Sequence, residues 1–204
     1  MYKIDFNNPI HIHFIGIGGI SMSGLAKILL SKGFTVSGSD AHSSALTDEL
    51  IGDGCIVSVP QSAGNITNDI DLVVYTAAIH PDNPEFKAAK EAGLPMLTRA
   101  ELLGQIMTIY KNAINIAGTH GKTTTTSMVS EILLAASMDP TISVGGILNS
   151  IGGNTRVGGD RYFVAEACEY TNSFLSFNPT MNIILNVKDC LLYTSPSPRD
   201  MRRS

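Results

Sequence analysis

The sequence predicts an α/β fold in which parallel strands alternate with helices. Two observations carry this prediction. An apolar run leads through a glycine-rich turn into a helical pattern near residue 16, and the same order returns near residue 118. Repeated strand–turn–helix units are typical of parallel sheets. We therefore expect a Rossmann-like parallel-sheet domain at residues 1–108 and part of a second α/β domain at residues 109–189.

The composition excludes several classes of protein. The chain has 204 residues, and 14 lysines and arginines against 18 aspartates and glutamates give a formal charge of −4. This balance argues against a dedicated nucleic-acid-binding protein, which usually carries a basic domain. No apolar run approaches the ~18 residues of a membrane span, and the N-terminus lacks the apolar stretch of a signal peptide. With three widely spaced cysteines, we expect a cytoplasmic protein without nucleic-acid or membrane partners.

The first domain follows the strand–helix alternation in order. Its short apolar runs predict strands, and its segments with helical spacing predict helices, the first of which ends at Gly33. The expected strands are Ile10–Gly16, Phe34–Asp40, Cys55–Val59 and Asp71–Tyr75, and the expected helices are Leu25–Leu30, Leu46–Ile51, Pro84–Ala92 and Arg99–Met107.

The second domain begins with a buried-strand pattern at Ala113–Ala117. A helix is expected from the next glycine-rich turn to about Ser137. The stretch Val144–Asp160 is rich in glycine and asparagine and has no tight periodicity, so we interpret it as an active-site-type loop. Two further strands are expected, at Arg161–Ala165 and Met181–Val187.

The last 15 residues, 190–204, change character abruptly. They are rich in serine and proline and continue no α/β pattern. Residues 190–200 match the translation of a transposon-based sequencing-library adapter, which favours a non-native tail over a natural disordered C-terminus. We leave this tail out of the reasoning on fold and site.

The strongest chemical signal is the turn between the Ala113–Ala117 strand and the helix that follows. Its residues are Gly118, Thr119, His120, Gly121, Lys122, Thr123 and Thr124. Backbone N–H groups of such a loop and the helix dipole attract phosphate. Lys122 is the catalytic candidate, positioned for the β- and γ-phosphates of a nucleotide, and the Thr123 hydroxyl can ligate Mg²⁺.

Two features of this turn leave alternatives open. The strict phosphate-loop pattern requires a glycine where this sequence has Ile116, so a glycine-capped turn with a surface lysine is the structural alternative. His120 is either a phosphate contact or a solvated loop residue whose backbone does the binding. The strand–loop–helix context favours phosphate binding and a P-loop-type domain.

Acidic residues follow the Arg161–Ala165 strand. A carboxylate at this position relative to a phosphate loop is where a Mg²⁺ ligand is expected, which makes Glu166 the first candidate and Glu169 the second. Mg²⁺ needs only one or two carboxylates besides phosphate oxygens and water. The alternative is a pair of solvated surface acids. Cys168, between them, has no base identifiable from the sequence and is expected to be a small buried residue.

The first glycine turn predicts a diphosphate site of weaker specificity. Gly16 and Gly18 fit the dinucleotide fingerprint, but Ser21 stands where its third glycine belongs. Asp40 is about the right distance along the chain for a ribose-binding acid, and a purely structural turn is the alternative. His11 and His13 face the same side of a strand, where two histidines without a third ligand are expected to be packing residues.

Five segments together resemble the Mur ligases, the amino-acid-adding enzymes of peptidoglycan synthesis. They are Gly16–Ala26, Tyr75–Ile79, Thr98–Leu102, Ala117–Thr126 and Ala165–Leu175. The likeness runs from about residue 9 to 187 and is to the members that join L-alanine to UDP-N-acetylmuramate. It implies a Rossmann-like domain for the UDP-sugar, a central ATPase domain and a C-terminal domain that completes the amino-acid site.

The resemblance also implies a mechanism and a set of site residues. ATP phosphorylates the muramic acid carboxylate, and the amine of L-alanine attacks the acyl phosphate. The phosphate loop would bind ATP, and Thr123 and Glu166 would hold Mg²⁺. The residues implied on the UDP-sugar side are Gly16, Gly18, Gly19, Ser21, Ser23, Thr76 and Arg99. Gln61 stands where a histidine is expected, which puts any uracil contact there in doubt.

The family pattern continues beyond the last expected strand with an Asp-His metal motif, a lysine that is often carbamylated, and the amino-acid-binding domain. None of these is present in the sequence, so we expect the chain as written not to ligate alanine. Three alternatives stay open: a ligase that recycles murein tripeptide onto UDP-N-acetylmuramate, an NAD-dependent oxidoreductase, and a non-catalytic nucleotide-binding module.

Overall fold

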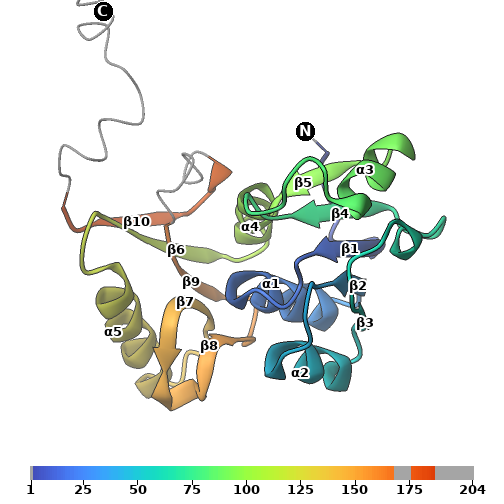
Figure 1. Ribbon diagram of the computed structural model, residues 1–204. Coiled ribbons are helices and arrows are strands. Elements are labelled where there is room, and N and C mark those ends of the chain that lie inside the picture. Colours follow the sequence, from blue (N-terminus) through green and yellow to red (C-terminus); the bar gives the residue numbers. More distant parts are fainter. Residues whose placement is uncertain (1, 168–175, 187–204) are drawn as a thin grey trace, which may run out of the picture. The chain divides into compact units, whose positions relative to one another are not determined.

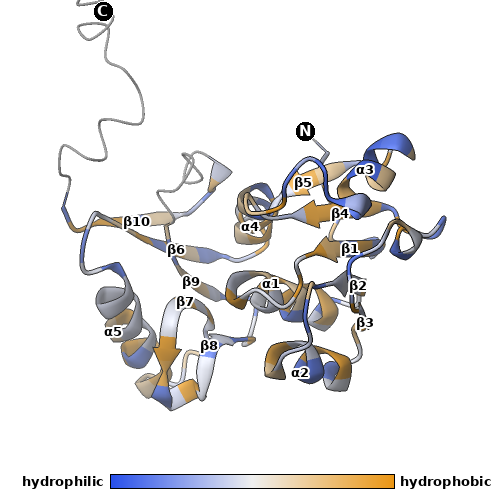
Figure 2. Cartoon of the chain, in the orientation of Figure 1, coloured by the Kyte–Doolittle hydropathy of each residue, from blue (hydrophilic) through white to orange (hydrophobic). Residues whose placement is uncertain are grey.

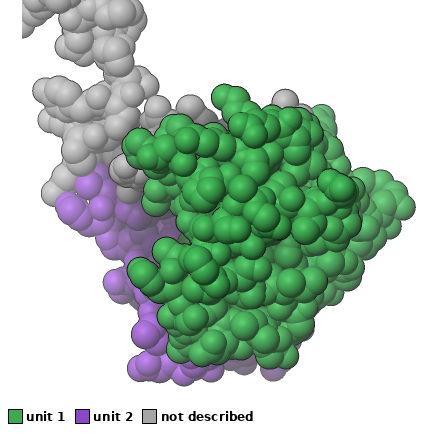
Figure 3. Space-filling view, turned by 45° about the vertical axis from the view of Figure 1, so that its right-hand side comes forward, with its two compact units in different colours: residues 1–106 green, residues 107–204 purple. Residues whose placement is uncertain are grey.

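The computed structural model describes residues 2–167 and 176–186. The chain divides into two compact units, Met1–Ile106 and Met107–Ser204, which are coloured separately in Figure 3. The functional division at residue 108 stays a prediction. Glu169, Cys168 and the predicted adapter-derived tail lie outside the described residues.

The first unit is built on a five-stranded parallel sheet (Figure 1). Its strands follow the order β3-β2-β1-β4-β5, and their bounds are β1 His11–Ile15, β2 Thr35–Ser39, β3 Ile56–Ser58, β4 Leu72–Tyr75 and β5 Met96–Thr98. The chain runs outward from β1 to β3 and then crosses to β4 on the other side. This reversal places a topological switch point at the carboxyl ends of β1 and β4, where ligands bind in open α/β sheets.

Helices alternate with these strands along the chain. They are α1 Ile20–Ser31, α2 Ala45–Asp53, α3 Pro84–Glu91 and α4 Arg99–Met107, with a short 3₁₀ turn, η1, at Ala63–Asn65. α1 buries Leu25, Ile28 and Leu29, and in β1 the side chains of Ile12 and Phe14 have no exposed surface. Figure 2 shows largely hydrophobic colouring along β1 and β4, and a mixture of hydrophobic and hydrophilic residues in α2 and α3. No helix within the described ranges is long and apolar enough to cross a membrane.

The second unit contains a mixed sheet in the order β10-β6-β9-β7-β8. The strands are β6 Asn112–Ala117, β7 Thr141–Leu148, β8 Gly153–Arg156, β9 Tyr162–Glu166 and β10 Met181–Ile184, and a second 3₁₀ turn, η2, covers Asn149–Ile151. Only the β7–β8 pair is antiparallel among the described strands. Helix α5, Lys122–Ala135, packs Leu133 against Ile114, Ile116 and Val164 of the sheet.

The predicted α/β class and Rossmann-like first sheet are confirmed, one sequence-based assignment is wrong, and one strand was not predicted. The predicted loop at Val144–Asp160 contains most of a hairpin, β7–η2–β8, because Ile142, Val144 and Leu148 form a buried cluster that holds β7 in the sheet. Its glycines and asparagines masked this pattern. Strand β5 was missed since its three residues are too few to show a period.

Candidate nucleotide-binding sites

The predicted phosphate loop lies between β6 and α5, at the carboxyl end of a central strand. Gly118 has φ +146° and Gly121, the residue before α5, has φ +86°. Residues that carry a side chain rarely adopt such φ values, so both positions favour glycine. The Lys122 ammonium donates to the Gly118 carbonyl at 2.6 Å and bridges the loop. The loop therefore brings a cation to the N-terminus of α5, which itself attracts anions.

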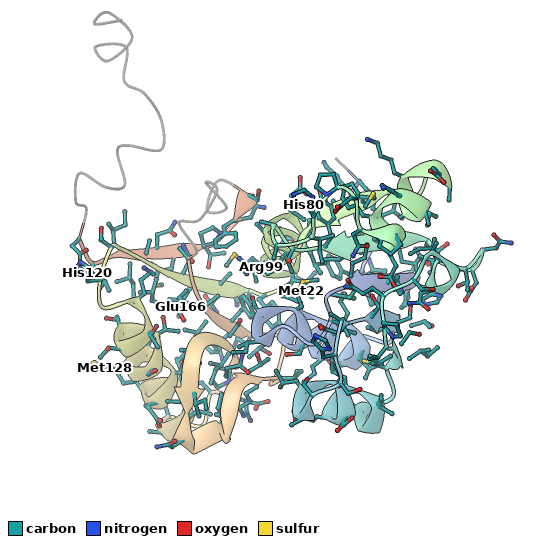
Figure 4. The ribbon with its side chains drawn as sticks, in the orientation of Figure 1. Met22, His80, Arg99, His120, Met128 and Glu166 are labelled. Carbon is teal, nitrogen blue, oxygen red and sulfur yellow. The ribbon has the colours of Figure 1, made fainter. Side chains whose placement is uncertain are left out.

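The predicted metal-binding pair does come together. The Thr123 hydroxyl donates to Glu166 Oε2 at 2.9 Å, although the two residues are 43 positions apart. Glu166 ends β9, and Figure 4 labels its side chain. Its Oε1 accepts the backbone N–H of Gly145 in β7. A Cβ at position 145 would lie 3.0 Å from Glu166 Cδ, so the glycine makes room for this carboxylate.

This pair fits Mg²⁺ by its chemistry. Mg²⁺ prefers oxygen ligands and commonly takes one or two from the protein, with phosphate oxygens and water completing its shell. Thr123 Oγ1 and Glu166 Oε2 are two such oxygens in hydrogen-bond contact beside a phosphate loop. Within the described ranges no group of three or more histidine, cysteine, aspartate or glutamate side chains could hold a metal.

The first glycine turn, Gly16–Gly19, is closed by its own backbone and by Asp40. The N–H groups of Gly16 and Ile17 both donate to the Ser39 carbonyl, at 2.8 and 2.9 Å. The Gly18 N–H donates to Asp40 Oδ2 at 2.9 Å, and the Gly19 N–H donates to the Gly16 carbonyl. The turn thus sits at the switch point in a fixed shape, with the predicted ribose-binding acid directly against it.

The other residues predicted for the UDP-sugar side divide into two groups. Arg99, at the start of α4, donates to Ser21 Oγ at 2.9 Å and so brings its guanidinium to the first turn of α1 (Figure 4). Thr76 follows β4, and its hydroxyl accepts the Ala78 N–H at 3.2 Å. Ser23, by contrast, is 2% exposed, and its hydroxyl donates to the Ile20 carbonyl within α1. Their roles in binding stay predictions.

The chain is similar in sequence to known proteins. The family model described as "Mur ligase family, catalytic domain" matches residues 11–111. A protein of Lachnospira eligens named UDP-N-acetylmuramate–L-alanine ligase is 92% identical over all 204 residues. This chain belongs to the Mur ligase family. It spans 44% of the length of that relative.

Solved Mur ligase structures share the fold. The UDP-N-acetylmuramate-alanine ligase of Thermotoga maritima has a TM-score of 0.80 and 34% identity, and the match covers 96% of this chain and 44% of that one. A ligase from Neisseria meningitides named for UDP-N-acetylmuramate and L-alanyl-γ-D-glutamyl-meso-diaminopimelate also has a TM-score of 0.80, with 29% identity over 89% of this chain and 61% of that one. The fold therefore does not separate the two kinds of Mur ligase.

Sequence reasoning missed Asn186, which holds the phosphate loop of this Mur ligase chain. Asn186 follows β10, and its side-chain amide spans both backbone groups of His120. The His120 N–H donates to Asn186 Oδ1 at 3.2 Å, and Asn186 Nδ2 donates to the His120 carbonyl at 2.9 Å. The side chain of His120 is exposed, and Figure 4 shows it at the loop before α5. No local pattern could reveal a contact between residues 66 positions apart.

Sequence reasoning also missed Glu85, in the first turn of α3. Its side chain has no exposed surface. Burial by itself raises the pKa of the Glu85 carboxyl, but the facing His13 imidazole and hydrogen bonds donated by Ser39 and Asn65 outweigh it and hold the pKa below its ordinary value. Glu85 is therefore ionised at neutral pH. His13, predicted as a packing residue, is 2% exposed and faces this carboxylate.

Proposed function

We propose that this chain carries the UDP-N-acetylmuramate-binding and ATP-binding parts of a ligase that joins L-alanine to UDP-N-acetylmuramate. The observation that carries the proposal is the convergence of Lys122, Thr123 and Glu166 at one phosphate loop. The identity to a relative of that name supports the choice of substrates. We place this reaction in the cytoplasm because it consumes ATP.

The proposed chemistry activates a carboxylate by phosphoryl transfer. A carboxylate oxygen of UDP-N-acetylmuramate takes the γ-phosphoryl group of ATP, which leaves ADP and an acyl phosphate. The L-alanine amine then attacks the carbonyl carbon and loses a proton, and the tetrahedral intermediate expels inorganic phosphate. Phosphoryl transfer needs mainly positioning and charge neutralisation, so a loop with a fixed cation is suited to it.

The described residues take separate parts in this reaction. The loop amides and Lys122 would hold the β- and γ-phosphates and neutralise the charge that develops during transfer. Thr123 and Glu166 would hold Mg²⁺, which supplies further charge neutralisation when bound. In the first unit, the Gly16–Gly19 turn and Arg99 would face the UDP diphosphate. No described residue is assigned to L-alanine.

A phosphate-release assay on a chimera tests the proposal. Residues 1–189 of this chain replace the corresponding part of the Lachnospira eligens relative, and phosphate release is measured with ATP, UDP-N-acetylmuramate and L-alanine. We expect release that requires all three substrates and is lost with Lys122→Ala. Release that a murein tripeptide supports but L-alanine does not would favour the recycling ligase instead. Binding of NAD to the first unit, without UDP-sugar binding, would favour an oxidoreductase.

A further inference from the structure

Glu85 is the one buried acidic residue within ranges 2–167 and 176–186. A buried carboxylate lowers the stability of a fold unless its charge is compensated. The groups that contact Glu85 therefore indicate which parts of the structure it holds in place. Part of the compensation is local: Glu85 lies in the first turn of α3, where the helix dipole favours a negative charge, and Asn83 caps the same turn. The remaining partners come from other parts of the first unit.

Both carboxylate oxygens are engaged by these distant partners. Oε1 accepts the Ser62 N–H at 3.2 Å and a hydrogen bond from Asn65 Nδ2 at 2.5 Å, which fixes the segment around η1. Oε2 accepts the Ser39 hydroxyl at the end of β2. It also lies 3.7 Å from His13 Nε2 in β1, a ring nitrogen that has no hydrogen-bond partner of its own. One side chain thus ties α3 to β1, β2 and η1.

Ser39 connects this carboxylate to the first glycine turn. Its hydroxyl is held by Glu85, and its carbonyl accepts the N–H groups of both Gly16 and Ile17. The conformation of the turn therefore depends on where Ser39 is held. Ser39 is thus a residue that contacts both Glu85 and the turn.

We infer that Glu85 is a positioning residue for the UDP-sugar site, which fixes the Gly16–Gly19 turn through Ser39 so that the turn is shaped for a diphosphate before the ligand arrives. This inference rests on the proposed function of the first unit. A preorganised site binds more tightly because less conformational freedom is lost on binding. Loss of the Glu85–Ser39 link accordingly weakens UDP-sugar binding without removing any group that touches the ligand.

The test measures the Kd for UDP-N-acetylmuramate and for ATP by calorimetry with the 204-residue chain. The variants are Glu85→Gln, Ser39→Ala and the double variant, and Glu91→Gln is the control because it makes the same change at the exposed end of α3. Circular dichroism and thermal melting establish that each variant is folded. If Glu85→Gln does not fold, Ser39→Ala decides, since it breaks the same link and leaves the carboxylate in place.

We expect Glu85→Gln and Ser39→Ala each to raise the Kd for UDP-N-acetylmuramate about tenfold, the range of one charge-assisted hydrogen bond. The double variant should be little worse than the worse single variant, because both changes remove one link. All variants should keep the wild-type Kd for ATP, and Glu91→Gln should also keep the wild-type Kd for UDP-N-acetylmuramate. Folded single variants within twofold of the wild-type UDP-sugar Kd, or fully additive effects, overturn the inference alone. A wild-type chain that binds ATP but not UDP-N-acetylmuramate overturns the proposed function of the first unit, and the inference with it.

Discussion

Replacement of Asn186 tests whether the phosphate loop is held in place by a side chain that lies outside the loop. The Asn186→Ala variant removes the two hydrogen bonds, 3.2 and 2.9 Å long, that fix the backbone of His120. Each is worth about 0.5–1.5 kcal/mol net, so the loop loses about 1–3 kcal/mol of restraint. If that restraint is needed to present the loop to phosphate, ATP affinity falls about 5- to 150-fold.

The measurement is the Kd for ATP by calorimetry on the 204-residue chain. Asn182→Ala is the matched control, because Asn182 lies on the same β10 strand and accepts a hydrogen bond from Asn115 of β6, away from the loop. Asn186→Asp should bind ATP more weakly still, since its carboxylate repels both the His120 carbonyl and the incoming phosphate. A folded Asn186→Ala variant that binds ATP within twofold of wild type would refute the reasoning.

Three further predictions follow from the sites. Lys122→Ala should abolish ATP-dependent acyl phosphate formation in the chimera and spare UDP-sugar binding; normal turnover would refute the loop assignment. Gly145→Ala should displace Glu166 from Thr123 and weaken binding of Mg²⁺ with ATP about 10- to 100-fold, as calorimetry with and without Mg²⁺ would show; equal loss in both conditions would contradict the metal assignment. Glu85→Gln should lower the free energy of unfolding by about 1–3 kcal/mol at pH 7. The folded pKa of Glu85 lies below its ordinary 4.5, so its stabilisation is full above about pH 4.5 and disappears as the pH falls through the folded value. Urea unfolding of both proteins should therefore converge in acid, and a constant gap would contradict this account.

Local sequence patterns predicted the two strand–turn–helix units because the residues that define each unit are close together in the chain. Gly118, Gly121 and Lys122 are close in the chain, and the apolar runs on either side define β6 and α5 without reference to the rest of the molecule. The pairing of Thr123 with Glu166 was also predictable, since the carboxyl ends of neighbouring parallel strands meet at one edge of a sheet.

The contacts that hold these sites were not predictable in the same way. Glu85 has the sequence context of an ordinary first-turn acid, and its partner Ser39 is 46 residues away. Asn186 is one of many asparagines in the second unit, and only the position of β10 beside β6 brings it to His120. Gly145 was interpreted as a loop residue, whereas it lies in β7, and a side chain at this position would collide with the Glu166 carboxylate. Each of these roles depends on tertiary packing.

We propose two separate nucleotide sites in the chain, one in each unit. The direct measurement is the Kd of the 204-residue chain, Lys122→Ala and Arg99→Ala for both UDP-N-acetylmuramate and ATP. We predict that Lys122→Ala loses ATP binding alone and that Arg99→Ala weakens UDP-N-acetylmuramate binding alone, by about tenfold or more for a lost charge-assisted contact. Loss of both ligands in either folded variant, or displacement of UDP-N-acetylmuramate by ATP from the wild-type chain, would contradict the claim.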